Sequence, residues 1–175
     1  MMSNETVIPV IVGLAAGVVL IILLASFTGV SPLQRNYDTT VITLERTTCY
    51  GTCPCYSIAI FGNGTVNYEG GHYTASVGKH TYTVPRENVS RLVDYFYSAG
   101  FLSMKDNYGL YGDCPKYPAS LTMDDRTKTV IHNRFTAPPS LISLDTRIDD
   151  YAGSYKWVNC PEGKRVATVD QGGCR

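Results

Sequence analysis

Three of the chain's six cysteines lie close together, and their spacing points most directly to chemistry. They are Cys49, Cys53 and Cys55. Two thiolates at positions i and i+4 can hold a Cu(I) ion or exchange with a disulfide. A copper ion would take a third ligand from elsewhere in the chain, and the candidates are the three histidines, His72, His80 and His132. The sequence therefore allows a copper-handling or thiol-exchange protein.

The same cysteines also fit a set of structural disulfides. The chain has six cysteines in all, an even number, and it is rich in tyrosine and poor in lysine, which favours an oxidising compartment. No two histidines have ligand spacing, and each lies in or beside a strand-like segment. We therefore favour disulfides over a metal or redox site. Among the many arrangements that six cysteines allow, the expected pairs are Cys49 with Cys53, Cys55 with Cys114, and Cys160 with Cys174.

The remaining polar residues do not form a recognisable catalytic pattern. The sequence contains no nucleophile elbow, no phosphate-binding loop and no HExxH zinc motif. We interpret Asp124-Asp125 as a turn and Asp149-Asp150 as a pair on a helix surface. Asp145 shares a helix face with Asp149, and we expect that face to be solvated. No catalytic residue and no cofactor are predicted.

The thirteen tyrosines offer a different kind of site. Tyr108, Tyr111 and Tyr117 lie in one long loop, where they could line a groove for a sugar or a peptide. Tyrosine is also a common strand residue, and we favour that structural interpretation.

The cysteine cluster leads directly into a β-hairpin. Apolar side chains alternate from Tyr56 to Phe61, the tripeptide Gly62-Asn63-Gly64 supplies a tight turn, and the alternation resumes at Val66 and Tyr68. Two further strands are expected over 73–77 and 80–84. The first half of the chain is therefore predicted to be a four- or five-stranded antiparallel meander.

After this meander the apolar period changes to that of a helix. A helix is expected from Pro85 to Gly100, and a second one begins at Pro138-Pro139 and ends at Gly153. The first helix has one apolar face, formed by Val89, Leu92, Val93, Phe96 and Tyr97, and the second has another, formed by Leu141, Leu144, Ile148 and Tyr151. Between the two helices we expect a loop over 106–120 and a hairpin whose strands, 121–123 and 127–131, flank Asp124-Asp125-Arg126. The predicted fold class is α+β, an antiparallel meander sheet with two helices.

The amino-terminal segment predicts a membrane anchor. Residues 7–27 carry no charge, and as a helix they would span roughly 30 Å, the thickness of the hydrocarbon core. A cleavable signal peptide is the main alternative, but no Lys or Arg precedes the apolar run and no clean cleavage site follows it. Gly13 and Gly17 form a GxxxG pair that would let two such helices approach closely.

These segments divide the chain into five parts. We expect a short tail over 1–6, a transmembrane helix over 7–27, a linker over 28–40, an α+β domain over 41–158, and a cysteine-containing tail over 159–175.

The compartment of the domain follows from two opposing signals. Arg35 and Arg46 lie beyond the helix, and a literal count of positive charges would leave the domain in the cytoplasm. Large domains, however, cross the membrane largely regardless of charge. We give more weight to the six cysteines and expect a single-pass protein of the cell membrane with its carboxy-terminal domain outside the cytoplasm. Since the net charge is zero, nucleic acid is disfavoured as a partner.

Several motifs in the same order resemble a family of prokaryotic domains of unknown function, often found behind a signal peptide, a lipoprotein signal or a membrane anchor. The family motif is ER-x-x-C-[FY]-G-x-C-P, and the resemblance covers about residues 44–158. The motifs that carry it are ER at 45–46, CYGTCP at 49–54 with Tyr56, the turn and strand at 62–70, AGF at 99–101, APP at 137–139, and AG at 152–153 with WV at 157–158. It implies an α+β domain outside the cytoplasm and no known activity. Cys55 stands where the family has a small apolar residue, and Cys114, Cys160 and Cys174 look like additions.

The spacing Cys49-x-x-x-Cys53-Pro54 is also similar to the copper-binding motif of the thioredoxin-like proteins that assemble copper sites in respiratory oxidases. That family places its motif between a strand and a helix, whereas a strand follows it here. The first hypothesis is therefore a membrane-anchored binding or scaffolding module without catalysis. The alternatives are a copper-handling or thiol-exchange protein and an accessory subunit that joins a membrane complex through Gly13 and Gly17.

Overall fold

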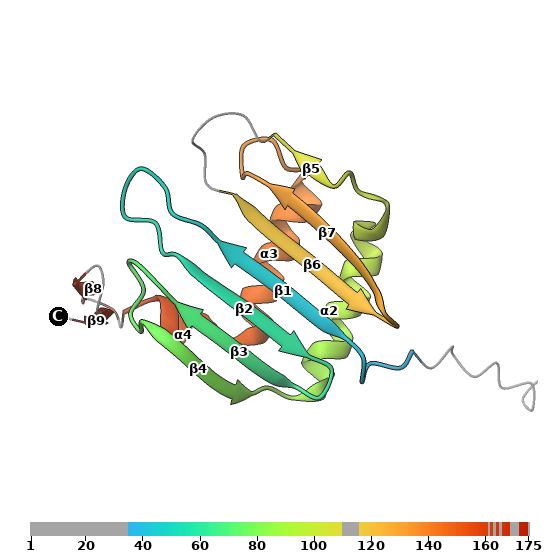
Figure 1. The fold of residues 1–175 in the computed structure, drawn as a ribbon, viewed down its shortest axis with the longest axis horizontal. Helices are drawn as coiled ribbons and strands as arrows, with labels where there is room; N and C mark the ends of the chain where they lie inside the picture. The colour runs from blue at the N-terminus through green and yellow to red at the C-terminus, as the bar shows by residue number, and fades with distance from the viewer. Residues whose placement is uncertain are drawn as a thin grey trace, which may run out of the picture. The chain divides into compact units, whose positions relative to one another are not determined.

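A seven-stranded sheet forms one layer of the domain, and its strands follow the order β4-β3-β2-β1-β6-β7-β5 (Figure 1). The computed structural model describes residues 35–109, 116–160, 162, 164, 166–168 and 172–174. The strands are β1 (Val41–Arg46), β2 (Tyr56–Phe61), β3 (Thr65–Gly70), β4 (Gly78–Thr83), β5 (Asn107–Tyr108), β6 (Tyr117–Met123) and β7 (Arg126–His132). All neighbouring pairs are antiparallel except β5 and β7.

The sheet follows the period-two pattern of the sequence. In β1, Ile42 and Leu44 are buried while Glu45 is exposed, and the same alternation runs through β2 and β3. The predicted hairpin over 56–70 is confirmed. Asp124 and Asp125 both have positive φ, 47° and 62°, as a tight hairpin turn between β6 and β7 requires. Local alternation and turn chemistry therefore build both hairpins.

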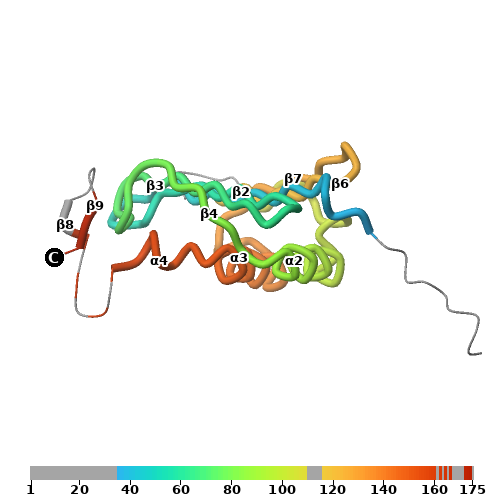
Figure 2. Tube along the Cα trace, turned by 90° about the horizontal axis from the view of Figure 1, so that it is seen from below, coloured from blue at the N-terminus to red at the C-terminus, as the bar shows by residue number. Residues whose placement is uncertain are grey.

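The helices all cover one face of this sheet (Figure 2). They are α2 (Arg86–Ser98), α3 (Pro139–Ala152) and the short α4 (Tyr155–Val158), with a 3-10 turn, η1 (Phe101–Ser103), after α2. Both predicted helices are confirmed, and Gly100 and Gly153 end them with φ of 69° and 64°. The core lies between the helices and the sheet. The helices contribute apolar side chains that are fully buried there, among them Leu92, Phe96, Leu141 and Ile148.

The meander predicted for the first half of the chain is confirmed, because β1 to β4 pair in sequence order and antiparallel. Four details of the predicted fold are wrong. The whole sheet is not a meander, because β6 pairs with β1 and leaves β1 in the middle. Residues 73–77 form no strand, since the N–H groups of Ala75 and Ser76 donate to carbonyls of α4 instead of to a neighbouring strand. The segment 106–120 is not all loop, as β5 and the start of β6 lie within it. Tyr97 is 40% exposed, off the buried face of α2.

The carboxy-terminal tail forms a small hairpin of β8 (Val166–Thr168) and β9 (Gly172–Cys174). The predicted disulfide between Cys160 and Cys174 is present. The Gly173 N–H donates to the Ala75 carbonyl at 2.8 Å, so the hairpin is held against the connection between β3 and β4.

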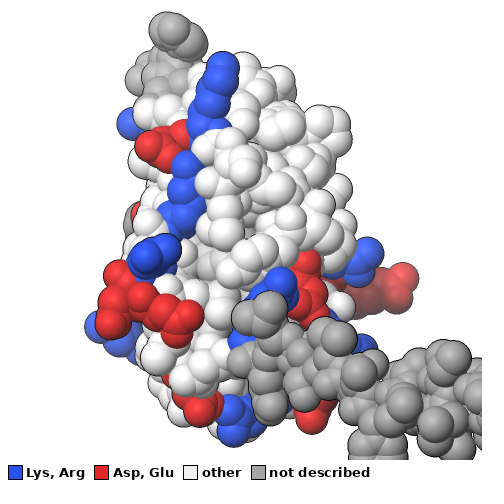
Figure 3. Space-filling view, turned by 90° about the vertical axis from the view of Figure 1, so that its right-hand side faces the viewer, with Lys and Arg blue, Asp and Glu red and all other residues white. Residues whose placement is uncertain are grey.

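The predicted anchor over 7–27, with Gly13 and Gly17, lies outside the described residues. So do Tyr111 and Cys114. Within the residues that are described, no helix has the length and apolar character needed to cross a membrane. On the face drawn in Figure 3, acidic and basic side chains lie beside one another and leave a broad uncharged area, in agreement with the zero net charge.

Candidate functional site

A row of polar residues crosses one end of the sheet on the side covered by the helices. Strand register places them next to one another: Arg46 pairs with Tyr56, and Tyr117 pairs with His132. Leu44 pairs with Ala119, so Tyr117 lies beside Arg46 as well. The Arg46 guanidinium lies 5.3 Å from the centre of the Tyr117 ring. Four strands therefore bring a cation, two phenols and an imidazole under α3.

Arg46 is the centre of this row. It continues the buried face of β1 after Ile42 and Leu44, and its side chain is only 15% exposed. Its Nη2 pairs with Asp149 Oδ2 at 2.6 Å, and its Nε donates to the Tyr56 hydroxyl at 2.9 Å. Its Nη1 lies 3.7 Å from Asp145 Oδ2. The cation is thus held on three sides.

Asp149 connects this cation to the helices. Its Oδ1 accepts hydrogen bonds from the Tyr56 hydroxyl at 2.8 Å and the Ser154 hydroxyl at 2.6 Å, while Oδ2 accepts from Arg46. The left-handed turn at Gly153 brings the buried Ser154 back toward the last turn of α3. One carboxylate therefore joins β1, β2, α3 and the start of α4.

Asp145 and His132 form a second buried pair one helical turn away. Neither is exposed to water, and Asp145 Oδ2 lies 3.2 Å from His132 Nε2. The other ring nitrogen, His132 Nδ1, has no hydrogen-bond partner among the described residues. The expectation that Asp145 and Asp149 lie on a solvated helix face is wrong, because Arg46 and His132 supply the partners that a buried carboxylate requires.

The protonation states in this network follow from burial and charge. Burial lowers the pKa of Arg46, but Tyr56, Asp149 and Asp145 outweigh that effect and raise it above its ordinary value. Burial also raises the pKa of Tyr56, an effect that Arg46 partly opposes. Arg46 is therefore a fixed cation, and Tyr56 is a neutral hydroxyl that donates to Asp149.

A pocket of about 370 Å³ opens beside Arg46 and Asp149. Its walls combine aromatic and apolar side chains with polar ones. The apolar and aromatic part is Pro54, Tyr56, Tyr117, Tyr155 and Val158, and the polar part includes Arg134, Thr146 and Asn159. Pockets of this size and mixture are typical of small-ligand sites.

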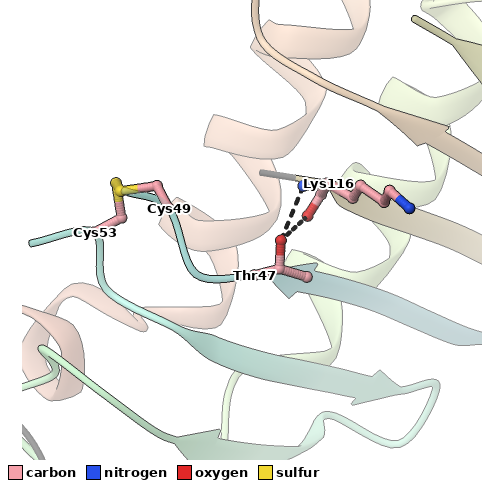
Figure 4. Close-up of a disulfide and its surroundings, with 4 residues drawn as sticks. All are labelled: Thr47, Cys49, Cys53 and Lys116. Atoms are coloured by element: carbon pink, nitrogen blue, oxygen red, sulfur yellow. Dashed lines mark hydrogen bonds between the residues drawn. A yellow bond between two sulfur atoms is a disulfide. The ribbon is translucent and has the colours of Figure 1, made fainter. Parts of the chain in front are cut away.

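The predicted disulfide between Cys49 and Cys53 is present and braces one wall of this pocket, to which Cys53 contributes. The loop it closes is fastened to the start of β6 by Thr47, as Figure 4 shows. The Thr47 hydroxyl donates to the Lys116 carbonyl at 3.0 Å and accepts from the Lys116 N–H at 2.8 Å. The connection between β1 and β2 is therefore fixed at both the sulfur bridge and its base.

Arg134 also lines the pocket, and it lies in the connection between β7 and α3. The buried Asn133 shapes this connection: its Oδ1 accepts from the N–H groups of Phe135 and Thr136 at 2.9 and 3.0 Å. Its Nδ2 donates to the Gly109 carbonyl. Phe135, which follows Arg134 in the chain, is 86% exposed. A rigid turn thus presents an exposed arginine and an exposed aromatic ring.

The residues predicted for a copper site do not come together. Cys49 and Cys53 are bonded to each other, so neither sulfur is a thiolate that could bind Cu(I). His80 stacks on Trp157 with ring centres 4.4 Å apart, His132 is buried on Asp145, and the His72 carbonyl accepts from the Cys55 N–H. Over the described part of the chain, no three His, Cys, Asp or Glu side chains are grouped to hold a metal ion.

Cys55 is not bonded to any described cysteine, and the pKa of its thiol is raised by burial and, to a smaller extent, by the charge of Glu45. Its predicted partner, Cys114, is not among the described residues, and that pairing stays a prediction. Of the three tyrosines considered for a groove, Tyr117 lines the pocket, Tyr108 is half-buried in β5, and Tyr111 is not described.

Arg46, Asp149 and Arg134 were missed as site residues. A signal for Arg46 exists in the sequence, because period-two alternation puts it on the face of Ile42 and Leu44. No comparable signal marks Arg134, whose position depends on how two distant connections meet.

A second cavity, of about 450 Å³, lies on the uncovered face of the sheet. Small and hydroxyl-bearing side chains form its floor, including Thr43, Ser57, Ala59 and Thr81. Glu69 and Lys79 lie at its border and are 4.0 Å apart. The residues that line it include neither the Arg46 and Asp149 pair nor an exposed aromatic ring such as Tyr155 of the first pocket.

Most of the domain described above matches a protein-family model. Residues 40–152 match a model described as a domain of unknown function, DUF6438. The match takes in the seven-stranded sheet, α2 and α3, and it stops before Ser154, Tyr155 and Asn159. No curated protein matches the chain.

Proposed function

This chain belongs to the DUF6438 family of domains of unknown function, and we propose that it acts as a non-catalytic binding module, displayed outside the cytoplasm, whose ligand occupies the pocket beside Arg46. The observation that carries the proposal is the pocket itself. It combines aromatic walls with polar groups that neighbouring side chains hold in place, an arrangement that suits recognition.

The hydrogen bonds around the pocket favour binding over catalysis. A serine nucleophile needs a base that can take its proton, but the buried Ser154 donates to Asp149, whose oxygens also accept from Arg46 and Tyr56. His132, the imidazole nearest in the row, is fully buried on Asp145 and does not line the pocket. The proposal gives the Cys49–Cys53 bond a structural role, as a brace of the pocket wall.

A ligand-blocking pair of variants tests the binding proposal. Thr146→Trp adds a large ring at an exposed α3 position of the pocket, and Thr81→Trp adds the same ring at the cavity on the uncovered sheet face. The full chain in lipid nanodiscs is exposed to a library of photoreactive fragments, and the labelling is quantified by mass spectrometry. We expect Thr146→Trp to remove most of the labelling and Thr81→Trp to leave it unchanged. The reverse result would place ligand binding on the other face and contradict the proposal.

The proposed location begins with the uncharged segment 7–27, which would anchor the chain in the lipid bilayer. The domain that follows would then lie outside the cytoplasm. The two disulfides support it, because such bonds persist in oxidising compartments. Fusion of alkaline phosphatase to the carboxy terminus tests it, since this enzyme becomes active only outside the cytoplasm. We expect an active phosphatase fusion and a dark green-fluorescent-protein fusion made through the same export route. A bright fluorescent fusion with inactive phosphatase would contradict the proposed topology.

A further inference from the structure

The charged residues that line the pocket leave one positive charge uncompensated. The side chains on its walls that bear a formal charge are those of Arg46, Arg134 and Asp149. Arg46 and Asp149 pair at 2.6 Å, and each makes further bonds inside the network. Both lone-pair-bearing oxygens of Asp149 already accept hydrogen bonds, so Asp149 is poorly placed to attract a cation from solution. The pocket therefore favours a ligand with a single negative charge.

Arg134 carries that charge. Its side chain makes no hydrogen bond and no ion pair with any other residue that the structure describes, and it is exposed. Its backbone is nevertheless fixed, since the Asn133 side chain accepts from the two N–H groups that follow Arg134. A guanidinium presents parallel N–H groups that match the two oxygens of a carboxylate. The backbone that carries this guanidinium is therefore ordered before a ligand binds.

The rest of the wall indicates what the carboxylate is attached to. Tyr117 and Tyr155 line the pocket together with Pro54 and Val158. Tyr155 is 64% exposed and Phe135, adjacent to Arg134 in the chain, is 86% exposed. Aromatic rings and arginine are the residues that contribute most to recognition at protein surfaces. Such a wall suits an aromatic or apolar body.

We propose that this pocket binds a monocarboxylate with an aromatic or apolar body, the carboxylate pairing with Arg134 and the body packing on the tyrosines. The inference rests on the proposed function and specifies its ligand class. A free aromatic acid and the carboxyl terminus of a peptide share this chemistry. A dianionic phosphate fits less well, because a second negative charge would lack a partner and would lie near Asp149.

The test compares ligands that differ only in charge. Isothermal calorimetry on the full chain in nanodiscs measures the affinity for 3-phenylpropionate and for its uncharged amide. We expect the acid to bind roughly tenfold more tightly, the effect of a hydrogen bond to a charged partner. Arg134→Gln should abolish the difference and Arg134→Lys should keep part of it. Lys79→Gln, which removes an exposed cation from the other sheet face, should change nothing.

Every other outcome decides one of the two proposals. Equal affinities for acid and amide that Thr146→Trp removes would overturn the carboxylate inference and leave the binding pocket standing. Binding that Thr146→Trp does not weaken, or no binding of either compound, would contradict both. Tighter binding of phenyl phosphate than of 3-phenylpropionate would overturn the inference that the ligand carries a single negative charge. If the carboxylate inference holds, the affinities for N-acetyl-Ala-Ala-Phe and 3-phenylpropionate show which kind of molecule supplies the carboxylate. Tighter binding of the peptide indicates a peptide carboxyl terminus, and tighter binding of 3-phenylpropionate indicates a free acid.

Discussion

Replacing Arg46 with leucine is expected to lower the free energy of unfolding by about 3–5 kcal/mol. The substitution leaves two carboxylates in the interior without their cation: Asp149, whose side chain is 20% exposed, and Asp145, which is 3% exposed. It also removes the donor to the Tyr56 hydroxyl. Desolvated charge without a partner is among the most destabilising changes a folded domain can receive. Chemical denaturation of the full chain, followed by the fluorescence of the single tryptophan, Trp157, measures the effect.

The chain contains a matched control for this experiment. Lys79 and Glu69 form an ion pair on β4 and β3, at 4.0 Å, but their side chains are 81% and 58% exposed. Lys79→Leu should therefore change the free energy of unfolding by less than about 1 kcal/mol. A loss of similar size in both variants would mean that the Arg46 network does not behave as a buried one.

The double variant Arg46→Leu/Asp149→Leu separates a missing partner from a missing interaction. If the cost of Arg46→Leu comes from stranded carboxylates, removing Asp149 as well should recover part of the lost stability, because an apolar pair often replaces a buried ion pair at little cost. Additive losses in the double variant would instead show that the two side chains contribute independently.

This network also explains why the sequence predicted the elements better than the site. The hairpin over 56–70 and the helices α2 and α3 are encoded locally, by alternation, turn residues and an apolar stripe. The position of β6 beside β1 is not, because it depends on contacts between strands that are distant in the chain. A carboxylate on a predicted helix is expected to face water unless a partner is known. Asp145 was therefore predicted to be exposed, although it lies among Leu141, Leu144 and Ile148 on the buried face of α3.

The two confirmed disulfides and the positions of the three histidines illustrate the same limit. Cys49 and Cys53 are near in sequence, and Cys160 and Cys174 close a short polar tail, so spacing favoured these two bonds among the arrangements that the sequence leaves open. A copper site would have required a histidine from a distant segment. Each histidine instead has a partner of its own, such as Trp157 for His80 and Asp145 for His132. Tertiary packing decided those pairings, and no local pattern carries that information.

Tertiary contacts also hold the residues of the pocket in place. A substitution of Asn133, whose side chain fixes the turn that carries Arg134, tests this. We expect Asn133→Ala to reduce the free energy of unfolding by about 2–3 kcal/mol, because it leaves the N–H groups of Phe135 and Thr136 and the Gly109 carbonyl without their partner. The side chain is only 5% exposed, so water compensates poorly. Asn133→Asp keeps the acceptor for both N–H groups but sets an oxygen that cannot donate against the Gly109 carbonyl, so it should also lose stability. Denaturation monitored by Trp157 fluorescence ranks the two variants.

The same variant separates the role of the turn from the role of the guanidinium. In Asn133→Ala, Arg134 is intact but the backbone that carries it is no longer fixed, so the carboxylate must pay the cost of ordering it. We therefore expect the preference for 3-phenylpropionate over its amide to shrink without disappearing, whereas Arg134→Gln abolishes it. Asn133→Asp should keep more of the preference than Asn133→Ala if its retained hydrogen bonds hold the turn. An unchanged preference in Asn133→Ala, together with the expected loss of stability, would show that Arg134 recognises the carboxylate without help from the turn.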